Sequence, residues 1–113
     1  MGDDPPANPK ETSPSTFTVA VEVNAWVNSL VGGPMSGATE FQEPATTGDT
    51  IEDVLRRLSA RFPKLNQTLW EGGQLGPHLE LIVNDTILGV DYQVDSPVDA
   101  NTRIMITGQF VGG

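Results

Sequence analysis

The sequence has no cysteine and a single histidine, His78, among its 113 residues. Without a thiol, the chain can form neither a disulfide scaffold nor a thioester on its own side chains. A zinc site would need mostly carboxylate ligands, which is unusual, and His78 has no recognisable nucleophile or second base to form a catalytic pair. We therefore expect no metal, no bound cofactor and no enzymatic machinery of the protein's own, and a structural or simply exposed role for His78.

Basic residues are also scarce, because 6 lysines and arginines together stand against 15 aspartates and glutamates, a formal net charge of −9. This charge argues against nucleic-acid binding, since phosphates would be repelled, and it favours a partner with a basic surface. No apolar run approaches the roughly 20 residues of a membrane-spanning helix. Residues 1–16 lack the apolar centre of a secretory signal. These absences predict a cytoplasmic protein without membrane contact.

The length is typical of one domain. Residues 1–16 contain four prolines and almost no hydrophobic side chains, so they are predicted to be a disordered N-terminal extension. This extension is either a spacer or a dispensable segment. The predicted folded domain covers residues 17–108, and residues 109–113 form a predicted flexible C-terminal tail.

A half-buried strand is predicted over residues 17–28, because hydrophobic and polar residues alternate there. Its buried positions are Phe17, Val19, Val21, Val23 and Val27. Trp26 falls among the polar positions, either as part of an exposed recognition patch or beneath a neighbouring loop. A glycine-rich loop over 29–37 and a second strand over 38–45 should complete an antiparallel hairpin.

A helix is predicted to open at Thr50, which can form a capping box with Asp53, and to end at Phe62 before Pro63. Its apolar face consists of Ile51, Val54, Leu55, Leu58 and Phe62. Its acid-first ion pairs, four residues apart, are Glu52 with Arg56 and Asp53 with Arg57. The arginines Arg56, Arg57 and Arg61 form either an anion site or an ordinary solvated face.

The remaining pattern predicts a short helix over 64–70, a strand over 78–84, a turn at Asn84-Asp85, a short strand over 87–90 and a last strand over 103–107 that Gly108 ends. The aspartates Asp91, Asp95 and Asp99 lack the spacing of an EF-hand and are interpreted as turn residues. The first and last strands are the most apolar, so they should lie side by side and parallel at the sheet centre. The predicted fold is α+β, a mixed sheet of four to five strands packed on one main helix, which is the β-grasp arrangement.

The C-terminal residues Gln109, Phe110, Val111, Gly112 and Gly113 follow this last strand. Five extended residues reach about 17 Å, and a glycine pair is the narrowest peptide, with backbone angles closed to other residues. A terminal carboxylate on such a stalk can enter a tight pocket of another protein and react there. The simpler interpretation is a chain that merely ends in two glycines, because the diglycines at 32–33 and 72–73 are expected to be ordinary turns.

In this order, the elements resemble the MoaD/ThiS family of small sulfur carriers, which have a ubiquitin-like β-grasp fold. The similarity covers about residues 17–113, and it lies in the order of several short motifs rather than in any one of them. These motifs are the valine-rich first strand, Leu30-Val31-Gly32-Gly33, Gly48-Asp49-Thr50-Ile51-Glu52-Asp53-Val54-Leu55, Arg61-Phe62-Pro63, Ile82-Val83-Asn84, Asp95-Ser96-Pro97-Val98 and the terminal Gly112-Gly113.

The resemblance implies that an E1-like enzyme, with its own ATP, adenylates the carboxylate of Gly113. Gly112, which has no side chain, would let the carboxylate enter a narrow active site. Gln109, Phe110 and Val111 would contact the enzyme together with the two glycines and the exposed part of the sheet. A sulfur-transfer or synthase partner would then act on a thiocarboxylate, in thiolation of the molybdopterin, thiamine, cysteine or tRNA type.

Two other hypotheses stay open. In the first, the protein is a ubiquitin-like modifier joined through Gly113 to lysines of target proteins. The chain itself offers only Lys10 and Lys64 as acceptors, which would limit self-linked polymers. In the second, it is a β-grasp interaction domain whose tail carries no chemistry.

Overall fold

The computed structural model describes residues 16–108 of the chain. Its elements are β1 (Thr16–Asn24), the 3-10 helix η1 (Ala25–Val31), β2 (Ala38–Thr46), α2 (Ile51–Ala60), α3 (Pro63–Leu69), β3 (Trp70–Glu71), β4 (Gln74–Leu75), β5 (Leu79–Val83), β6 (Thr86–Ile87) and β7 (Arg103–Gly108). The predicted N-terminal extension, apart from Thr16, and the predicted tail lie outside the described residues. Within residues 16–108, no helix is long and apolar enough to cross a membrane.

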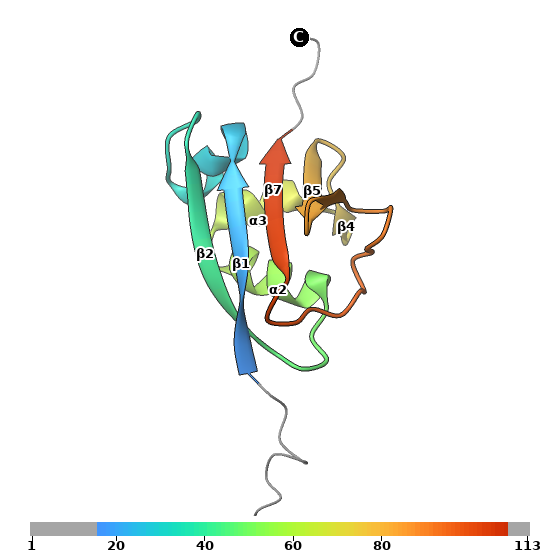
Figure 1. Cartoon of the computed structure of the whole chain (residues 1–113). Coiled ribbons are helices and arrows are strands. Elements are labelled where there is room, and N and C mark those ends of the chain that lie inside the picture. The colour runs from blue at the N-terminus through green and yellow to red at the C-terminus, as the bar shows by residue number, and fades with distance from the viewer. Residues whose placement is uncertain (1–15, 109–113) are drawn as a thin grey trace, which may run out of the picture.

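Five strands form one mixed sheet in the order β2-β1-β7-β5-β6 (Figure 1). β1 pairs antiparallel with β2 and parallel with β7, and β5 pairs antiparallel with β7. The predicted hairpin and the predicted parallel pairing of the first and last strands are therefore confirmed. Helices α2 and α3 cover one face of the sheet, and in Figure 1 the other face is turned toward the viewer. This is the predicted ubiquitin-like β-grasp architecture.

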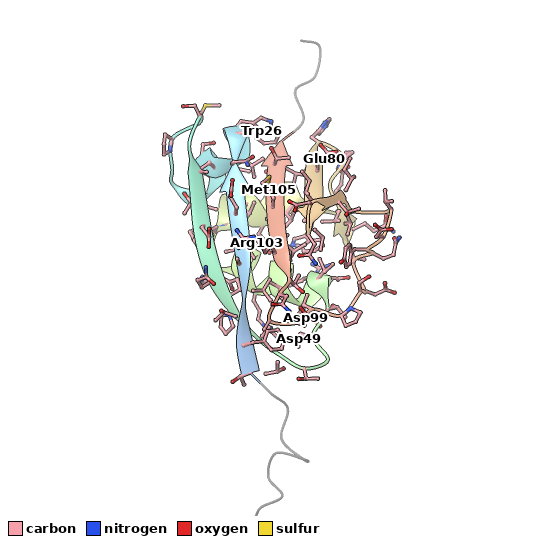
Figure 2. The ribbon with its side chains drawn as sticks, viewed as in Figure 1. Trp26, Asp49, Glu80, Asp99, Arg103 and Met105 are labelled. Atoms are coloured by element: carbon pink, nitrogen blue, oxygen red, sulfur yellow. The ribbon has the colours of Figure 1, made fainter. Side chains whose placement is uncertain are left out.

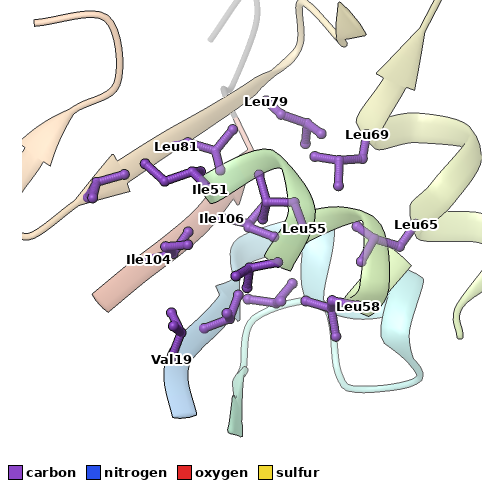
Figure 3. Packing of buried hydrophobic residues seen from close by; sticks show 14 of the residues in the cluster. Val19, Ile51, Leu55, Leu58, Leu65, Leu69, Leu79, Leu81, Ile104 and Ile106 are labelled. Atoms are coloured by element: carbon purple, nitrogen blue, oxygen red, sulfur yellow. The ribbon is translucent and has the colours of Figure 1, made fainter. Parts of the chain in front are cut away.

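The core lies between the sheet and the two helices (Figure 3). Strand side chains alternate between faces, and Val19, Val21 and Val23 of β1 are all fully buried on the helix side. The residues that meet them from the other elements are Ile51, Val54, Leu55, Leu58, Leu65, Leu69, Leu79, Leu81, Val83, Ile104 and Ile106. Burying one such side chain stabilises the fold by roughly 1.5–3 kcal/mol, so β7 is held firmly at the centre.

The main helix α2 begins as predicted. The Thr50 hydroxyl accepts a hydrogen bond from the Asp53 amide at 3.2 Å, and the Asp53 carboxylate accepts one from the Thr50 amide at 2.9 Å, which confirms the capping box. The helix ends at Ala60, two residues before the predicted end, because Phe62 is already extended ahead of Pro63.

One of the two predicted ion pairs on α2 is confirmed. Arg56 contacts Glu52 at 3.1 Å. The predicted partnership of Arg57 with Asp53 is wrong, because the Arg57 guanidinium contacts Asp49 at 2.7 Å. The Asp53 carboxylate is turned back onto Thr50 by the capping box, so tertiary geometry and capping override the helical spacing.

The first predicted strand is too long. β1 ends at Asn24, and Ala25 has a left-handed backbone with φ 58°, which ends the alternation and begins η1. Trp26 and Val27 therefore belong to η1, and the predicted loop begins only after Val31. Val27 is buried, as predicted, although it reaches the core from a helix and not from a strand.

One further prediction needs correction, and one small element was not predicted. The short strand expected over 87–90 is β6 (Thr86–Ile87), because Gly89, with φ 104°, turns the chain away. A small hairpin of β3 and β4 was not predicted. Gly72 and Gly73 form its turn at φ 60° and 84°, so these glycines are a turn, as expected, but one that joins two short strands.

Candidate functional site

The described structure ends at the carboxyl end of β7. Ile106 is fully buried there and pairs with Val23 of β1 on one side and Leu81 of β5 on the other. Gly108, the last described residue, is also buried and pairs with Leu79. Because β1 and β7 are parallel, their carboxyl ends lie together at the same end of the sheet. The residues after Gly108 therefore begin at a well-packed position at this end of the sheet.

The residues predicted to react or to contact a partner all follow this point directly. Gly112 and Gly113, the predicted reacting pair, and Gln109, Phe110 and Val111, the predicted contacts, lie outside the described residues. The structure describes the residue immediately before them, Gly108, at the end of the central strand.

Trp26 lies against Gly108. A Cβ built on Gly108 would stand 2.8 Å from Cδ1 of the indole and nearer still to Nε1 and Cε2, so the ring fills the space of a side chain at position 108. The indole is half-buried and packs against the core. Sequence reasoning missed this contact, because it depends on η1. The available signal was a glycine inside an apolar strand, which marks the close approach of another group.

We call the sheet face opposite the helices the outer face. Its residues are the ones that alternate with the core positions, and they include Ala20, Glu22, Glu40, Glu80, Ile82, Arg103, Met105 and Thr107. The strand register places Met105 beside Glu22 on β1 and Ile82 on β5. Figure 2 shows Arg103, Met105 and Glu80 on this face and Trp26 at the edge where β7 ends.

The outer face combines a small apolar strip with carboxylates. A depression of about 50 Å³ between Ala20, Ile82 and Met105 is bordered by the three carboxylates of Glu22, Glu40 and Asp85 and by the guanidinium of Arg103. This depression is too small for a cofactor, since ligand pockets measure roughly 300–1,000 Å³, and a second, open hollow of about 290 Å³ on the same face, beside Thr18, Gln42 and Arg103, only approaches that range. The face is suited instead to a protein partner that offers apolar contact inside a basic rim.

The arginines of α2 are engaged in structural contacts, which favours the solvated-face interpretation over an anion site. The Arg56 guanidinium stacks on the Trp70 ring at 3.8 Å from its centroid and donates to the carbonyl oxygen of Gly73 at 3.0 Å. It also pairs with Glu52. These contacts attach the β3–β4 hairpin to α2.

Arg57 and Arg61 each hold a carboxylate. The hydrogen bond from Arg57 lowers the pKa of Asp49 to about 2, assisted by the Thr46 amide, and the same bond raises the pKa of Arg57. Arg61 donates to both carboxylate oxygens of Glu43, and this contact raises the pKa of Arg61. The Glu43–Arg61 pair connects β2 to the end of the main helix, and the Asp49–Arg57 pair connects the turn after β2 to the same helix.

Metal-binding geometry is absent from the described part of the chain, where no three His, Asp or Glu side chains are grouped to hold an ion. The Asp99 carboxylate accepts hydrogen bonds from the Asn101 amide at 2.8 Å and the Thr102 hydroxyl at 3.2 Å. This is the predicted behaviour of a turn aspartate. His78 is exposed.

No protein-family model matches the chain, and no curated protein matches it by sequence. Solved structures do match. Small archaeal modifier protein 1 from Methanosarcina acetivorans is 21% identical with a TM-score of 0.69, over 88% of this chain and 99% of that one. The Haloferax volcanii HVO 2177 protein is 20% identical with a TM-score of 0.66, over 100% and 94%.

A third match comes from the Amycolatopsis orientalis BexX/CysO complex, at 17% identity and a TM-score of 0.65, over 84% of this chain and 99% of that one. The matched chains are covered almost completely in all three cases, so the similarity extends over the whole fold and not over a fragment. The chain thus shares the ubiquitin-like β-grasp fold with small modifier proteins and with a component of a two-protein complex.

Proposed function

We propose that the protein is a sulfur carrier whose terminal carboxylate, on Gly113, is adenylated by an E1-like enzyme and converted to a thiocarboxylate. One observation carries this proposal. The central strand of a β-grasp sheet ends at Gly108, five residues before a Gly112-Gly113 terminus. The structural similarity to a named modifier and to a chain of the BexX/CysO complex supports a role as a carrier or modifier that works with a partner protein.

The proposed chemistry needs little from the chain beyond an accessible acyl carbon. A carboxylate oxygen of Gly113 attacks the α-phosphorus of ATP, and pyrophosphate leaves. The resulting mixed anhydride makes the acyl carbon a good electrophile. A hydrosulfide ion then attacks this carbon, which gives the thiocarboxylate, AMP and a proton. ATP belongs to the enzyme, and the two glycines give the carboxylate a stalk narrow enough to reach it.

The outer face is the surface proposed to dock on the activating enzyme. It lies on the strands that lead to the tail, since Arg103, Met105 and Thr107 alternate along β7. Its acidic border, with Glu22 and Glu40, is complementary to a basic surface. An enzyme held there would meet the residues that follow Gly108.

A modifier function is the second candidate, and the similarity to small archaeal modifier protein 1 favours it. Here a lysine amine of a target protein attacks the activated acyl carbon in place of sulfur, and the product is an isopeptide bond. Lys64, in α3, is an exposed lysine of the chain and would be the acceptor on the folded domain for self-linkage.

Intact mass spectrometry distinguishes the candidates. The protein is incubated with each E1-like enzyme of its host, ATP and sulfide, beside a control that lacks Gly112 and Gly113. A gain of about 16 Da in the full-length chain alone, from oxygen replaced by sulfur at the activated carbon, supports the carrier. Conjugates with host proteins in a lysate, absent from the control, support the modifier. If no product forms with any enzyme, both the carrier and the modifier function are contradicted, and the hypothesis of an interaction domain remains.

A further inference from the structure

The end of β7 pairs with a strand on one side only and packs against η1. The pairing of β1 with β7 stops at Val23 and Ile106, whereas the pairing of β5 with β7 continues to Gly108. The stretch Thr107–Gly108 therefore lacks a β1 neighbour. The indole of Trp26 lies over the helix-covered side of Gly108, where it occupies the space of a Cβ at position 108.

The backbone just before Trp26 is in an unfavourable conformation. Ala25 has φ 58°, a left-handed angle that is unfavourable for a residue with a Cβ. This angle takes the chain out of β1 into η1, whose first turn holds Trp26. Such outliers persist where the surrounding structure holds them in place, and they gather at functional sites.

The rest of η1 is anchored, which makes the indole a firm support. The Ser29 hydroxyl donates to the carbonyl oxygen of Trp26 at 2.7 Å. Val27 and Asn28 are fully buried, and the Asn28 side chain donates to the carbonyl oxygen of Pro34 at 2.9 Å and accepts from the Thr39 hydroxyl at 2.7 Å. The helix is thereby attached to the loop after it and to β2.

We propose that Trp26 is a positioning residue that holds Gly108 in place at the end of β7 and so fixes the point from which the C-terminal carboxylate must reach the activating enzyme. This inference rests on the proposed function. Its physical basis is that the indole fills the space beside Gly108, so the loss of the ring lets the backbone at the start of the tail shift. Reactions that depend on orientation lose large factors from displacements of even 1 Å.

Trp26→Ala and Trp26→Phe test the proposal, with Trp70→Phe as the matched control. The chain has only these two tryptophans, and Trp70 lies in β3, which is paired in the separate two-stranded sheet. ATP–pyrophosphate exchange by the E1-like enzyme is measured well below the lowest melting temperature, so that every variant is folded. Trp26→Ala is expected to lower kcat about tenfold with KM within about twofold, Trp26→Phe less, and Trp70→Phe not at all.

Gly108→Ala approaches the same contact from the other side. The added Cβ collides with the indole, so kcat should fall as in Trp26→Ala. The double variant Trp26→Ala/Gly108→Ala removes the collision and should regain thermal stability without regaining kcat. A purely structural role for the contact would restore both together and would overturn the proposal.

A measurement without enzyme separates this inference from the proposed function. The heteronuclear ¹⁵N nuclear Overhauser effect of the Gly108 amide should be lower in Trp26→Ala than in wild type and unchanged in Trp70→Phe. Equal values in all three proteins, an unchanged kcat, or a loss confined to KM would each overturn the positioning role. If no enzyme adenylates wild type, the proposed function falls, and the relaxation data alone decide whether Trp26 holds Gly108 in place.

Discussion

The Glu43 carboxylate on β2 is bound through both oxygens by the guanidinium of Arg61, the residue after α2. Glu43 is 1% exposed, whereas the side chain of Arg61 is 49% exposed. A buried carboxylate is thus compensated by an arginine that reaches it from the surface. The pair attaches the edge strand β2 to the main helix, and an inward-pointing charge on an edge strand also opposes pairing with other chains.

Arg61→Met should destabilise the protein by about 2 kcal/mol, because it leaves the Glu43 carboxylate buried without its cation. The value lies below the 3–5 kcal/mol of a fully buried pair since Arg61 is half-exposed. The double variant Glu43→Leu/Arg61→Met removes the charge as well and should be more stable than Arg61→Met. Urea denaturation measures both. Equal losses in the two variants would show that Glu43 does not need its partner.

The Asp49–Arg57 pair predicts a specific pH dependence. The folded-state pKa of Asp49, about 2, lies below its ordinary value of 3.8. The ionised carboxylate therefore stabilises the fold fully above about pH 4, and this contribution is lost as the pH falls toward 2. Asp49→Asn should melt at a lower temperature than wild type at pH 6, and the two melting curves should converge near pH 2.

The comparison between the two proteins isolates Asp49, because all other carboxylates titrate in both. Thermal melts followed by circular dichroism at several pH values between 2 and 6 give the difference directly. A gap that stays constant over this range would assign the loss to the altered side chain itself and not to the ion pair.

The capping box offers a third prediction. Thr50→Ala removes the acceptor of the Asp53 amide and should cost about 1 kcal/mol, the usual loss at a helix N-cap. Thr50→Ser keeps the hydroxyl and should leave the stability nearly unchanged, because serine is at least as good an N-cap as threonine. Denaturation midpoints of the two variants provide the measurement, and comparable destabilisation in both would rule out the hydroxyl as the stabilising group.

The parts of the fold that follow from local pattern were predictable from the sequence. The alternation of Val19, Val21 and Val23 gave the face of β1, and Thr50 with Asp53 gave the start of α2, because each signal involves residues close in the chain. The end of β1 was not predictable. It depends on the left-handed backbone of Ala25, and alanine carries no preference for that conformation.

The candidate site shows the same division. The diglycine end could be identified by inspection of the sequence, but the contact of Trp26 with Gly108 joins residues 82 positions apart and follows from the parallel pairing of β1 and β7. The partner of Arg57 was mispredicted for a similar reason, since Asp49 lies before the helix and is brought near by the turn that follows β2.

Deletion of Gly112 and Gly113 should abolish adenylation and leave the melting temperature nearly unchanged. Neither residue has a side chain, so their removal takes no apolar surface from a core, whereas the remaining terminus is two residues too short and carries a bulkier end. ATP–pyrophosphate exchange and a thermal melt of the same sample test both parts. A large drop in melting temperature would show that these glycines stabilise the domain and would contradict a terminus that another protein can take up.

The outer face can be tested by charge reversal. Glu80 lies on this face beside Thr107 of β7, and Glu71 is exposed on the separate β3–β4 hairpin. Glu80→Lys and Glu71→Lys change the net charge equally, so a difference between them reports on location alone.

If the enzyme docks a basic surface against the outer face, Glu80→Lys should raise KM for adenylation about three- to tenfold with little change in kcat, since a charge on the rim of an interface acts mainly on association. The difference from Glu71→Lys should shrink at high ionic strength, where exposed charges are screened. Identical kinetics for the two variants at low salt would move the docking surface away from the outer face, and they would leave the proposal for the tail to be judged by its own deletion.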